Sequence, residues 1–265
     1  MKTIAICIGK GGQAKTHTAC SMSYLLAEAD HKTLVIDCDP QCNASLLFGA
    51  GVEGVNTLYD CWIEVRKPIS PLECIQHTEK GDIIAGDSLI SELTGRIYDG
   101  SLHVNSLKEK VLDPIEESNL YEYVILDCPP DLTGFINRSV ISSSQELLVT
   151  LKGDRLSVKG LVDICKVISN VREMINPKIK INGMLLTNYQ GNTKNGQNAL
   201  DNAELIAKQL GTHLYKSKIR YCAKGQEAID KADFVVRYAP YCNSSLDYKQ
   251  FVKEFLEMEA KNGII

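Results

Sequence analysis

The chain has 265 residues and a formal net charge of −4, from 29 lysines and arginines against 33 aspartates and glutamates. Hydrophobic residues make up 44% of it, which is enough for a full core in one large domain or two small ones. This composition excludes a protein coated in positive charge, although one basic face is compatible with it, and the lack of any apolar run of about 18 residues excludes a membrane span.

Short β-rich runs alternate with amphipathic stretches along the whole chain. In chain order, we expect strands at residues 3–8, 33–37, 82–85, 123–127, 146–151, 180–189 and, more weakly, 212–216. We expect helices at residues 16–29, 56–64, 70–77, 103–118, 133–144, 156–174, 194–210 and 245–261, with Ser70 as an N-cap before Pro71. This alternation predicts a doubly wound α/β fold, in which a mostly parallel sheet carries helices on both faces.

No linker rich in Pro, Ser or Gly divides the chain, and neither does a charge block or an internal repeat. We therefore expect a single domain over residues 1–265. The ten cysteines include no Cys-x-x-Cys pair and no zinc spacing, and several lie inside apolar runs. We interpret them as free thiols of a cytoplasmic protein, with an iron–sulfur or redox role as the alternative.

A glycine-rich loop lies between the first predicted strand and the first predicted helix. It reads Gly9-Lys10-Gly11-Gly12-Gln13-Ala14-Lys15-Thr16. Backbone N–H groups of such a loop, together with the helix N-terminus, surround phosphate groups. Lys15 is placed to reach the β- and γ-phosphates, and the Thr16 hydroxyl is placed to hold Mg²⁺. The loop therefore predicts a nucleotide site with a bound magnesium ion.

Carboxylates follow two further predicted strands. Asp37 and Asp39 end the strand at 33–37, and Asp127 ends the strand at 123–127. Carboxyl ends of parallel strands face the crevice where ligands bind. Asp127 is typical of the Walker B carboxylate that holds Mg²⁺. Asp37 is either a member of the site or a structural carboxylate that caps the following turn.

Four segments share a further pattern. They are the loop with its additional lysine, Lys10; the run Asp37-Cys38-Asp39-Pro40-Gln41-Cys42-Asn43; the run Asp127-Cys128-Pro129-Pro130; and the strand that ends at Asn188 and Tyr189. Together they resemble the ParA/Soj-type partition ATPases, which are deviant Walker A P-loop ATPases of the ParA/MinD superfamily. The resemblance extends from residue 2 to about residue 255. It implies a P-loop NTPase fold with the first strand directly at the start, leaving no room for a helix-turn-helix domain.

The resemblance also implies an activity and its residues. We expect a slow, partner-stimulated ATPase that takes ATP and Mg²⁺, with Lys10, Lys15 and Asp39 as its catalytic residues. Lys10 would act on the nucleotide of the other protomer in an ATP-state homodimer, and Asp39 would position the attacking water and support the metal beside Thr16 and Asp127. The nucleotide contacts would be Gly9, Lys10, Gly11, Gly12, Gln13, Ala14, Lys15, Thr16, His17, Asn188, Lys216 and Ser217.

Partners of the ParA/Soj type include DNA, bound without sequence preference, and a ParB-like protein that stimulates hydrolysis. Residues 205–237 hold seven lysines and arginines against three acidic residues, so a local basic stripe exists in an acidic chain. We expect DNA contacts at Lys194, Lys216, Lys218, Arg220 and Lys224, with Lys194 replacing a family arginine that falls near Asn192. The function expected is partition of plasmid, chromosome or mobile-element DNA by a nucleoid-associated protein.

Three residues depart from the family pattern: Ala14, His17, and Thr150, which stands where the family usually has proline. Ala14 stands where the family has glycine, which costs on the order of 1–3 kcal/mol if the position needs a positive φ and little if it is helical. His17 replaces a threonine. The alternative function is therefore an ATP-gated scaffold or positioning ATPase of the same fold, with little hydrolysis or no DNA role. A membrane-bound form is disfavoured, because residues 251–265 carry three glutamates against two lysines.

Overall fold

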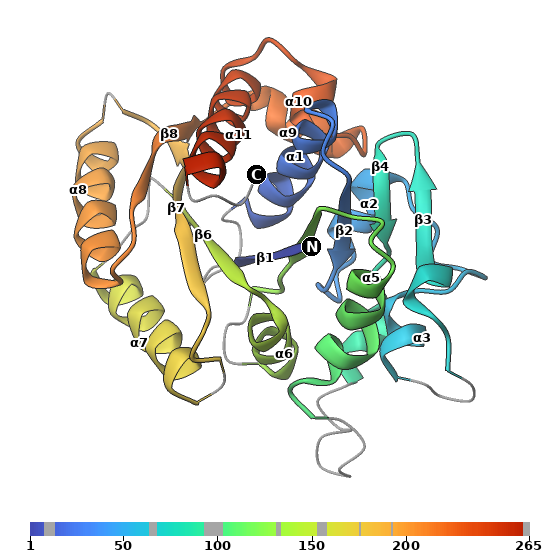
Figure 1. The fold of residues 1–265 in the computed structure, drawn as a ribbon. Coiled ribbons are helices and arrows are strands. Elements are labelled where there is room, and N and C mark those ends of the chain that lie inside the picture. Colours follow the sequence, from blue (N-terminus) through green and yellow to red (C-terminus); the bar gives the residue numbers. More distant parts are fainter. Residues whose placement is uncertain are drawn as a thin grey trace.

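The computed structural model describes residues 1–7, 14–63, 68–92, 103–130, 134–152, 158–174, 176–191 and 193–261. Within them an eight-stranded sheet runs in the order β3-β4-β2-β5-β1-β6-β7-β8 (Figure 1). The strands are β1 (Lys2–Cys7), β2 (Thr33–Asp37), β3 (Ile75–Thr78), β4 (Gly81–Ile84), β5 (Tyr123–Asp127), β6 (Glu146–Lys152), β7 (Lys180–Tyr189) and β8 (Leu214–Arg220). All neighbouring pairs are parallel except β3 with β4, which are antiparallel.

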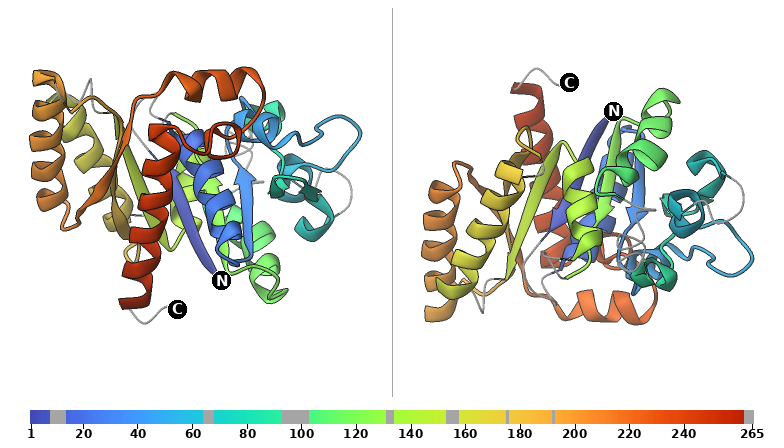
Figure 2. Two further views of the ribbon diagram at one scale, coloured as in Figure 1. Left: turned by 90° about the horizontal axis from the view of Figure 1, so that it is seen from above. Right: turned by 90° about the horizontal axis from the view of Figure 1, so that it is seen from below.

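Helices cover both faces of the sheet, as the two views of Figure 2 show. One face carries α1 (Lys15–Glu28), α2 (Asn43–Phe48), α9 (Ala223–Asp230), α10 (Val235–Tyr238) and α11 (Asn243–Lys261). The other face carries α3 (Leu58–Ile63), η1 (Pro71–Cys74), η2 (Ser88–Glu92), η3 (Lys108–Leu112), α5 (Asp113–Glu117), α6 (Phe135–Ser143), α7 (Val158–Met174) and α8 (Lys194–Gln209). The doubly wound α/β prediction is therefore confirmed.

The central strand explains why the sequence reads as an unbroken apolar run. In β1, Ile4 and Ile6 pack into the core beneath α1 and α11, whereas Ala5 and Cys7 pack into the core on the opposite face. A strand covered on both faces needs no polar alternation. It lies between β5 and β6, so its carboxyl end opens at the middle of the sheet.

Most predicted elements are present, and two differ in an instructive way. The predicted helix over 70–77 is wrong beyond Cys74, because residues Ile75–Thr78 pair with β4 as an edge strand. Its N-cap is confirmed, since the Ser70 hydroxyl accepts a hydrogen bond from the N–H of Leu72 at 3.3 Å. The weak strand predicted at 212–216 extends to Arg220. In the part of the chain described, no helix is both long and apolar enough to cross a membrane.

Candidate nucleotide and metal site

The predicted phosphate and carboxylate residues meet at the carboxyl ends of three adjacent strands. β5 lies between β1 and β2, and Asp37 and Asp127 are direct neighbours across the β2–β5 pair. A hollow of about 340 Å³ opens there. Its lining includes Ala14, Lys15, Thr16, His17, Asp39, Gln41, Asn43 and Pro130. Five of the predicted phosphate-loop residues, Gly9, Lys10, Gly11, Gly12 and Gln13, lie outside the described residues.

Asp127 stands out at this edge because its buried carboxylate lacks well-formed hydrogen bonds. It is fully buried, and neither carboxylate oxygen makes a hydrogen bond of normal length and angle among the described residues, although the Thr16 hydroxyl lies close enough to interact with it. Burial raises the pKa of Asp127 well above its ordinary value, and the nearby Asp37 raises it further, while Thr16 and Lys15 lower it. A buried carboxylate left without partners is costly unless a cation neutralises it.

The donor set around Asp127 fits a hard divalent cation. Carboxylate and hydroxyl oxygens are the protein ligands that Mg²⁺ prefers. Asp127 itself is buried and does not line the hollow, but Thr16 and Asp39, which do line it, act on the Asp127 carboxylate and bring further oxygens beside it. Among the described residues, no three His, Cys, Asp or Glu side chains form a metal cage by themselves. Because Mg²⁺ usually keeps water and phosphate oxygens in its shell, a sparse protein donor set of this kind is the one expected for a nucleotide-bound ion.

Asp37, unlike Asp127, has hydrogen-bond partners for both of its carboxylate oxygens. Its Oδ2 accepts hydrogen bonds from the Ser45 N–H at 2.8 Å and the Ser45 hydroxyl at 2.7 Å, and its Oδ1 accepts from the Asp39 N–H at 3.2 Å. Burial raises the pKa of Asp37 to about 6, although the Ser45 bonds lower it. Of the two roles left open by the sequence, this pattern favours the structural one.

Two residues that the sequence did not single out complete this support. The N–H of Gly86 donates to the Ser45 hydroxyl at 2.9 Å. A Cβ at Gly86 would come within 2.9 Å of the Asp37 carbonyl oxygen and 3.1 Å of the Asp37 Cγ, so only glycine fits this close approach. The only sequence signal was a glycine two residues after β4.

Ala14 adopts the more costly of the two conformations considered for it. Its φ is +61° and its ψ is +24°, in the left-handed region, and its side chain makes no capping bond to α1. Its carbonyl accepts a hydrogen bond from the Thr18 N–H at 2.8 Å, so it still starts the helix. His17 lies one turn into the same element, where burial lowers its pKa and keeps the ring uncharged at neutral pH.

The AAA_31 sequence profile, described as an AAA domain, matches residues 1–181, which is more than half of the chain. The chain belongs to this AAA_31 family. Its resemblance to the ParA/Soj type is confirmed by similarity to the chromosome partitioning protein ParA of Caulobacter vibrioides. The two are 27% identical over 264 residues, which cover 98% of this chain and 95% of that protein.

Solved structures show the same fold as this AAA_31 chain. A cobyrinic acid a,c-diamide synthase from Mycobacterium smegmatis, with bound ATP analog and magnesium, aligns with a TM-score of 0.83 at 21% identity, covering 99% of this chain and 96% of that one. The cell division ATPase MinD of Pyrococcus furiosus aligns with a TM-score of 0.76 at 20% identity, covering 97% and 99%. The expected P-loop NTPase fold is therefore confirmed.

Three predicted nucleotide contacts of the AAA_31 chain do not line the hollow. Asn188 is the last residue but one of β7, at the same edge of the sheet, and has a φ of +50°. The Lys216 N–H donates to the Glu254 carboxylate at 2.8 Å. The buried Ser217 donates to that carboxylate through its N–H at 2.9 Å and its hydroxyl at 2.7 Å. These contacts connect β8 to α11.

The predicted DNA-binding residues of the AAA_31 chain fall into two groups. Arg220 is paired with Asp247 through two hydrogen bonds of 2.8 Å, and Lys224 is paired with Glu227 at 2.6 Å. Lys216 and Lys218 occupy alternate positions of β8 and line a shallow hollow of about 470 Å³ beside Lys208. Lys194 begins α8. The pairings reduce the positive charge that the sequence count attributes to this stripe.

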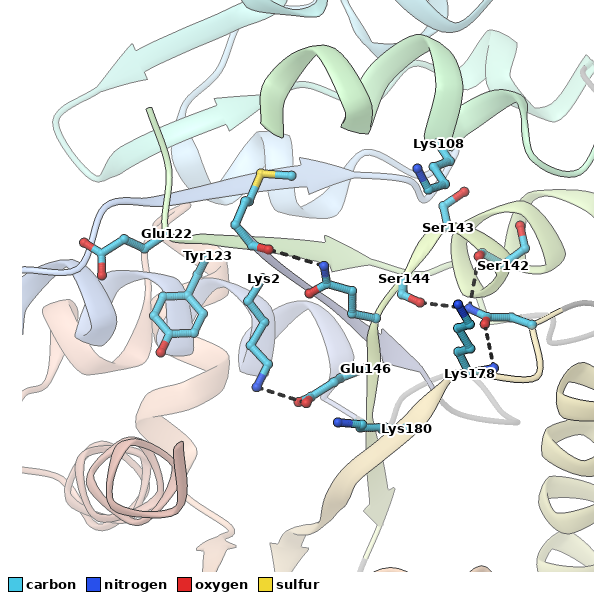
Figure 3. A pocket seen from close by; sticks show the side chains of 13 residues that line it. Lys2, Lys108, Glu122, Tyr123, Ser142, Ser143, Ser144, Glu146, Lys178 and Lys180 are labelled. Carbon is cyan, nitrogen blue, oxygen red and sulfur yellow. Dashed lines mark hydrogen bonds and ion pairs between the residues drawn. The ribbon is translucent and has the colours of Figure 1, made fainter. Parts of the chain in front are cut away.

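A larger hollow, of about 730 Å³, lies at the amino ends of the strands (Figure 3). Lys2 points across it to Glu146, with a 3.0 Å separation between Nζ and Oε1, and Lys178 and Lys180 lie on its rim. It is on the edge opposite Asp39 and Asp127, and no predicted site residue lines it. It is therefore separate from the candidate nucleotide site.

Proposed function

We propose that this chain is an Mg²⁺-dependent ATPase that dimerises around ATP and partitions DNA. The observation that carries the proposal is the fully buried Asp127, whose two oxygens make no hydrogen bond of normal geometry among the described residues, beside Lys15 and Thr16 at the end of β5. A cation bound there would neutralise the buried carboxylate next to a phosphate-binding lysine. Relatives named ParA and the fold shared with nucleotide-bound proteins support the same conclusion.

Each residue at the hollow then has a defined task. Lys15 binds the β- and γ-phosphates, and Thr16, Asp39 and Asp127 hold Mg²⁺ directly or through water. Bound Mg²⁺ supplies charge neutralisation at the phosphates. Asp39 keeps one oxygen on the Gln41 N–H at 3.0 Å, which fixes its carboxylate while it orients the attacking water. Lys10 of a second protomer completes the site, so hydrolysis depends on dimerisation.

ATP binding is tested by isothermal titration with Mg·ATP on the full chain. We expect binding by the parent and loss of at least tenfold in affinity for Lys15→Ala, because its ammonium is a direct phosphate contact. Lys80→Met removes a comparably buried lysine that does not itself line the hollow, so it serves as the matched control if it folds. Equal affinity in the parent and Lys15→Ala would contradict the proposal.

We propose that DNA contacts come mainly from Lys194, Lys216 and Lys218. Phosphate contact needs cations that are free of nearby carboxylates, and Arg220 and Lys224 are both paired. Dimerisation doubles this stripe, so binding to random duplex DNA should need ATP and should weaken steeply with salt. A ParB-like protein then stimulates hydrolysis and releases the dimer.

A mobility-shift assay with random duplex DNA at low salt tests the assignment of DNA contacts to Lys216 and Lys218. Lys216→Glu with Lys218→Glu should abolish the ATP-dependent shift, whereas Lys178→Glu with Lys180→Glu makes the same charge change at the opposite edge and should not. No shift by the parent at low salt would contradict the DNA role while leaving ATP binding intact.

Ala14 favours a second candidate function, an ATP-gated scaffold or positioning ATPase with little turnover. Its left-handed φ of +61° places strain directly before Lys15, where loop geometry controls hydrolysis. MinD, which shares the fold, is a cell division ATPase. Single-turnover hydrolysis with and without DNA distinguishes the candidates: a partition ATPase accelerates with DNA and partner, and a scaffold does not.

A further inference from the structure

The hollow of about 730 Å³ at the amino ends of the strands is formed by segments that lie far apart in the sequence (Figure 3). Lys2 comes from β1, and Ser143 comes from the last turn of α6. Lys178 and Lys180 come from the turn before β7 and from its first position. A hollow of this volume is large enough for a small organic molecule. None of the predicted site residues that the structure describes lines it.

Asn176 holds the turn before β7 against the end of α6. Its Nδ2 donates to the carbonyl oxygens of Ser142 at 3.1 Å and Ser144 at 3.0 Å. Its Oδ1 accepts a hydrogen bond from the Lys178 N–H at 3.2 Å. Carbonyl groups at the C-terminal end of a helix carry partial negative charge, which repels an anion. Because Asn176 pairs two of these carbonyls, it weakens that repulsion and places Lys178 beside the end of α6.

The carboxylates that line the hollow already have partners. The described lining includes four lysines and two glutamates. Glu146 lies 3.0 Å from the Lys2 Nζ and accepts a hydrogen bond from the Asn182 side chain at 2.6 Å. Glu122 lies 2.9 Å from the His31 Nδ1. The lining therefore has an excess of positive charge, and its negative charges are engaged with other groups.

The polar groups of the lining that have no partner are hydrogen-bond donors. Lys108 is paired with Asp113, but Lys178 and Lys180 are exposed and form no ion pair within the described part of the chain. The Ser143 hydroxyl is buried and makes no hydrogen bond to any described group. Rotation about its χ1 angle to another staggered position turns this hydroxyl without moving the backbone. Ammonium groups only donate, so their complement is a ligand that only accepts, which is an oxyanion.

Lysines without an arginine favour phosphate over a carboxylate. No arginine is among the described residues of the lining. The planar fork of arginine suits bidentate binding of carboxylates, whereas lysine binds phosphate as a point charge. We propose that this hollow binds a small organic phosphate monoester, whose phosphate contacts Lys178, Lys180 and Ser143 and whose organic part fills the remaining volume. Since Asp127 lies at the opposite edge of the sheet, both sites can be occupied together.

The test measures thermal unfolding of the full chain with inorganic phosphate and, separately, with glycerol 3-phosphate. Each is compared with potassium chloride of equal ionic strength. We expect both to raise Tm beyond the salt control, and glycerol 3-phosphate to bind more tightly. Lys178→Ala with Lys180→Ala should weaken binding at least about tenfold, and Ser143→Ala about threefold, because each removes donors to the phosphate. Lys216→Ala with Lys218→Ala removes the same charge at the opposite edge and should leave binding unchanged.

Two further measurements place the bound phosphate. Lys15→Ala should keep the rise in Tm, because Lys15 belongs to the candidate nucleotide site. Acetylation with N-hydroxysuccinimide acetate, mapped by mass spectrometry, needs no variant. Glycerol 3-phosphate at about twice its Kd should slow acetylation of Lys178 and Lys180 about threefold and leave the exposed Lys249 unchanged.

Four outcomes would overturn the proposal. They are no rise in Tm beyond the salt control, equal affinity for inorganic phosphate and glycerol 3-phosphate, loss of the rise in Lys15→Ala, and an unchanged rise in the variant that lacks both Lys178 and Lys180.

Discussion

The strain at Ala14 gives a quantitative prediction about the loop that precedes Lys15. Ala14 sits at a φ of +61°, where a Cβ costs about 1–2 kcal/mol that glycine does not incur. Ala14→Gly removes that cost. It also adds conformational freedom to the unfolded chain, which opposes the gain by about 0.4–1 kcal/mol. We expect Ala14→Gly to stabilise the ligand-free protein by about 0.5–1 kcal/mol.

Thermal unfolding measures this change. A chain of 265 residues has an unfolding entropy of about 0.55 kcal/mol per kelvin, so the expected rise in Tm is about 1–2 °C. Ala232→Gly is a matched control, because Ala232 has a φ of +49° and does not line the hollow. Gly49→Ala is the reverse change, since Gly49 has a φ of +73° and a Cβ there meets no atom within 4 Å.

These three variants separate strain from function. Ala14→Gly and Ala232→Gly should both raise Tm, and Gly49→Ala should lower it by a similar amount. ATP affinity should change less than about threefold in all three, because the strain is carried equally with and without nucleotide, whereas single-turnover hydrolysis is expected to rise only for Ala14→Gly. A fall in Tm for Ala14→Gly, with the controls behaving as described, would refute the left-handed conformation at this position.

Three further predictions concern buried charges. Asp127→Asn should stabilise the ligand-free chain by about 1–2 kcal/mol, because it removes a buried carboxylate that makes no hydrogen bond of normal geometry among the described residues. It should also abolish the added thermal stability that Mg·ATP gives the parent, and destabilisation without ligand would contradict this. The folded state keeps the Asp37 proton up to about pH 6, whereas the unfolded chain loses it near pH 3.8, so the folded state binds more protons between these two pH values. The free energy of unfolding should therefore fall by up to roughly 3 kcal/mol as the pH rises from 3.8 to 6. Asp37→Asn should make the free energy of unfolding, measured in urea, less dependent on pH in this range. Lys2→Met leaves Glu146 and Glu259 buried without their cation and should cost about 3–5 kcal/mol in denaturant unfolding, while adding Glu259→Gln should recover part of the loss; no recovery would argue against a charge effect.

Residues of the candidate site could be predicted where the end of a strand determines their position. Lys15, Thr16, Asp39 and Asp127 follow buried apolar runs, and parallel pairing brings such ends to one edge whatever the loops do. The support of Asp37 was not predictable in the same way. Ser45 lies eight residues away on α2, and its contact depends on how that helix docks.

The charge pattern near β8 shows a second limit of sequence reasoning. Counting residues 205–237 gives a basic stripe, but the carboxylate that neutralises Arg220 comes from Asp247 on α11. The composition of a segment cannot show that its basic side chains pair with carboxylates from a helix far along the chain. The edge strand β3 was missed for a related reason, because a four-residue run gives too little periodicity to outweigh a helix N-cap at Ser70.

The ion pair between Lys2 and Glu259 has a consequence for synthesis of the chain. Lys2 lies on the middle strand of the sheet and Glu259 lies near the end of the last helix, 257 residues later. During translation Lys2 is synthesised long before Glu259, the second carboxylate that pairs with it in the folded protein. The apolar side chains that α11 covers also stay exposed to solvent until that helix docks. A nascent or prematurely terminated chain that stops before Glu259 therefore exposes both the incompletely paired Lys2 and this apolar surface. We expect chaperones and proteases to act on such fragments rather than on the folded protein.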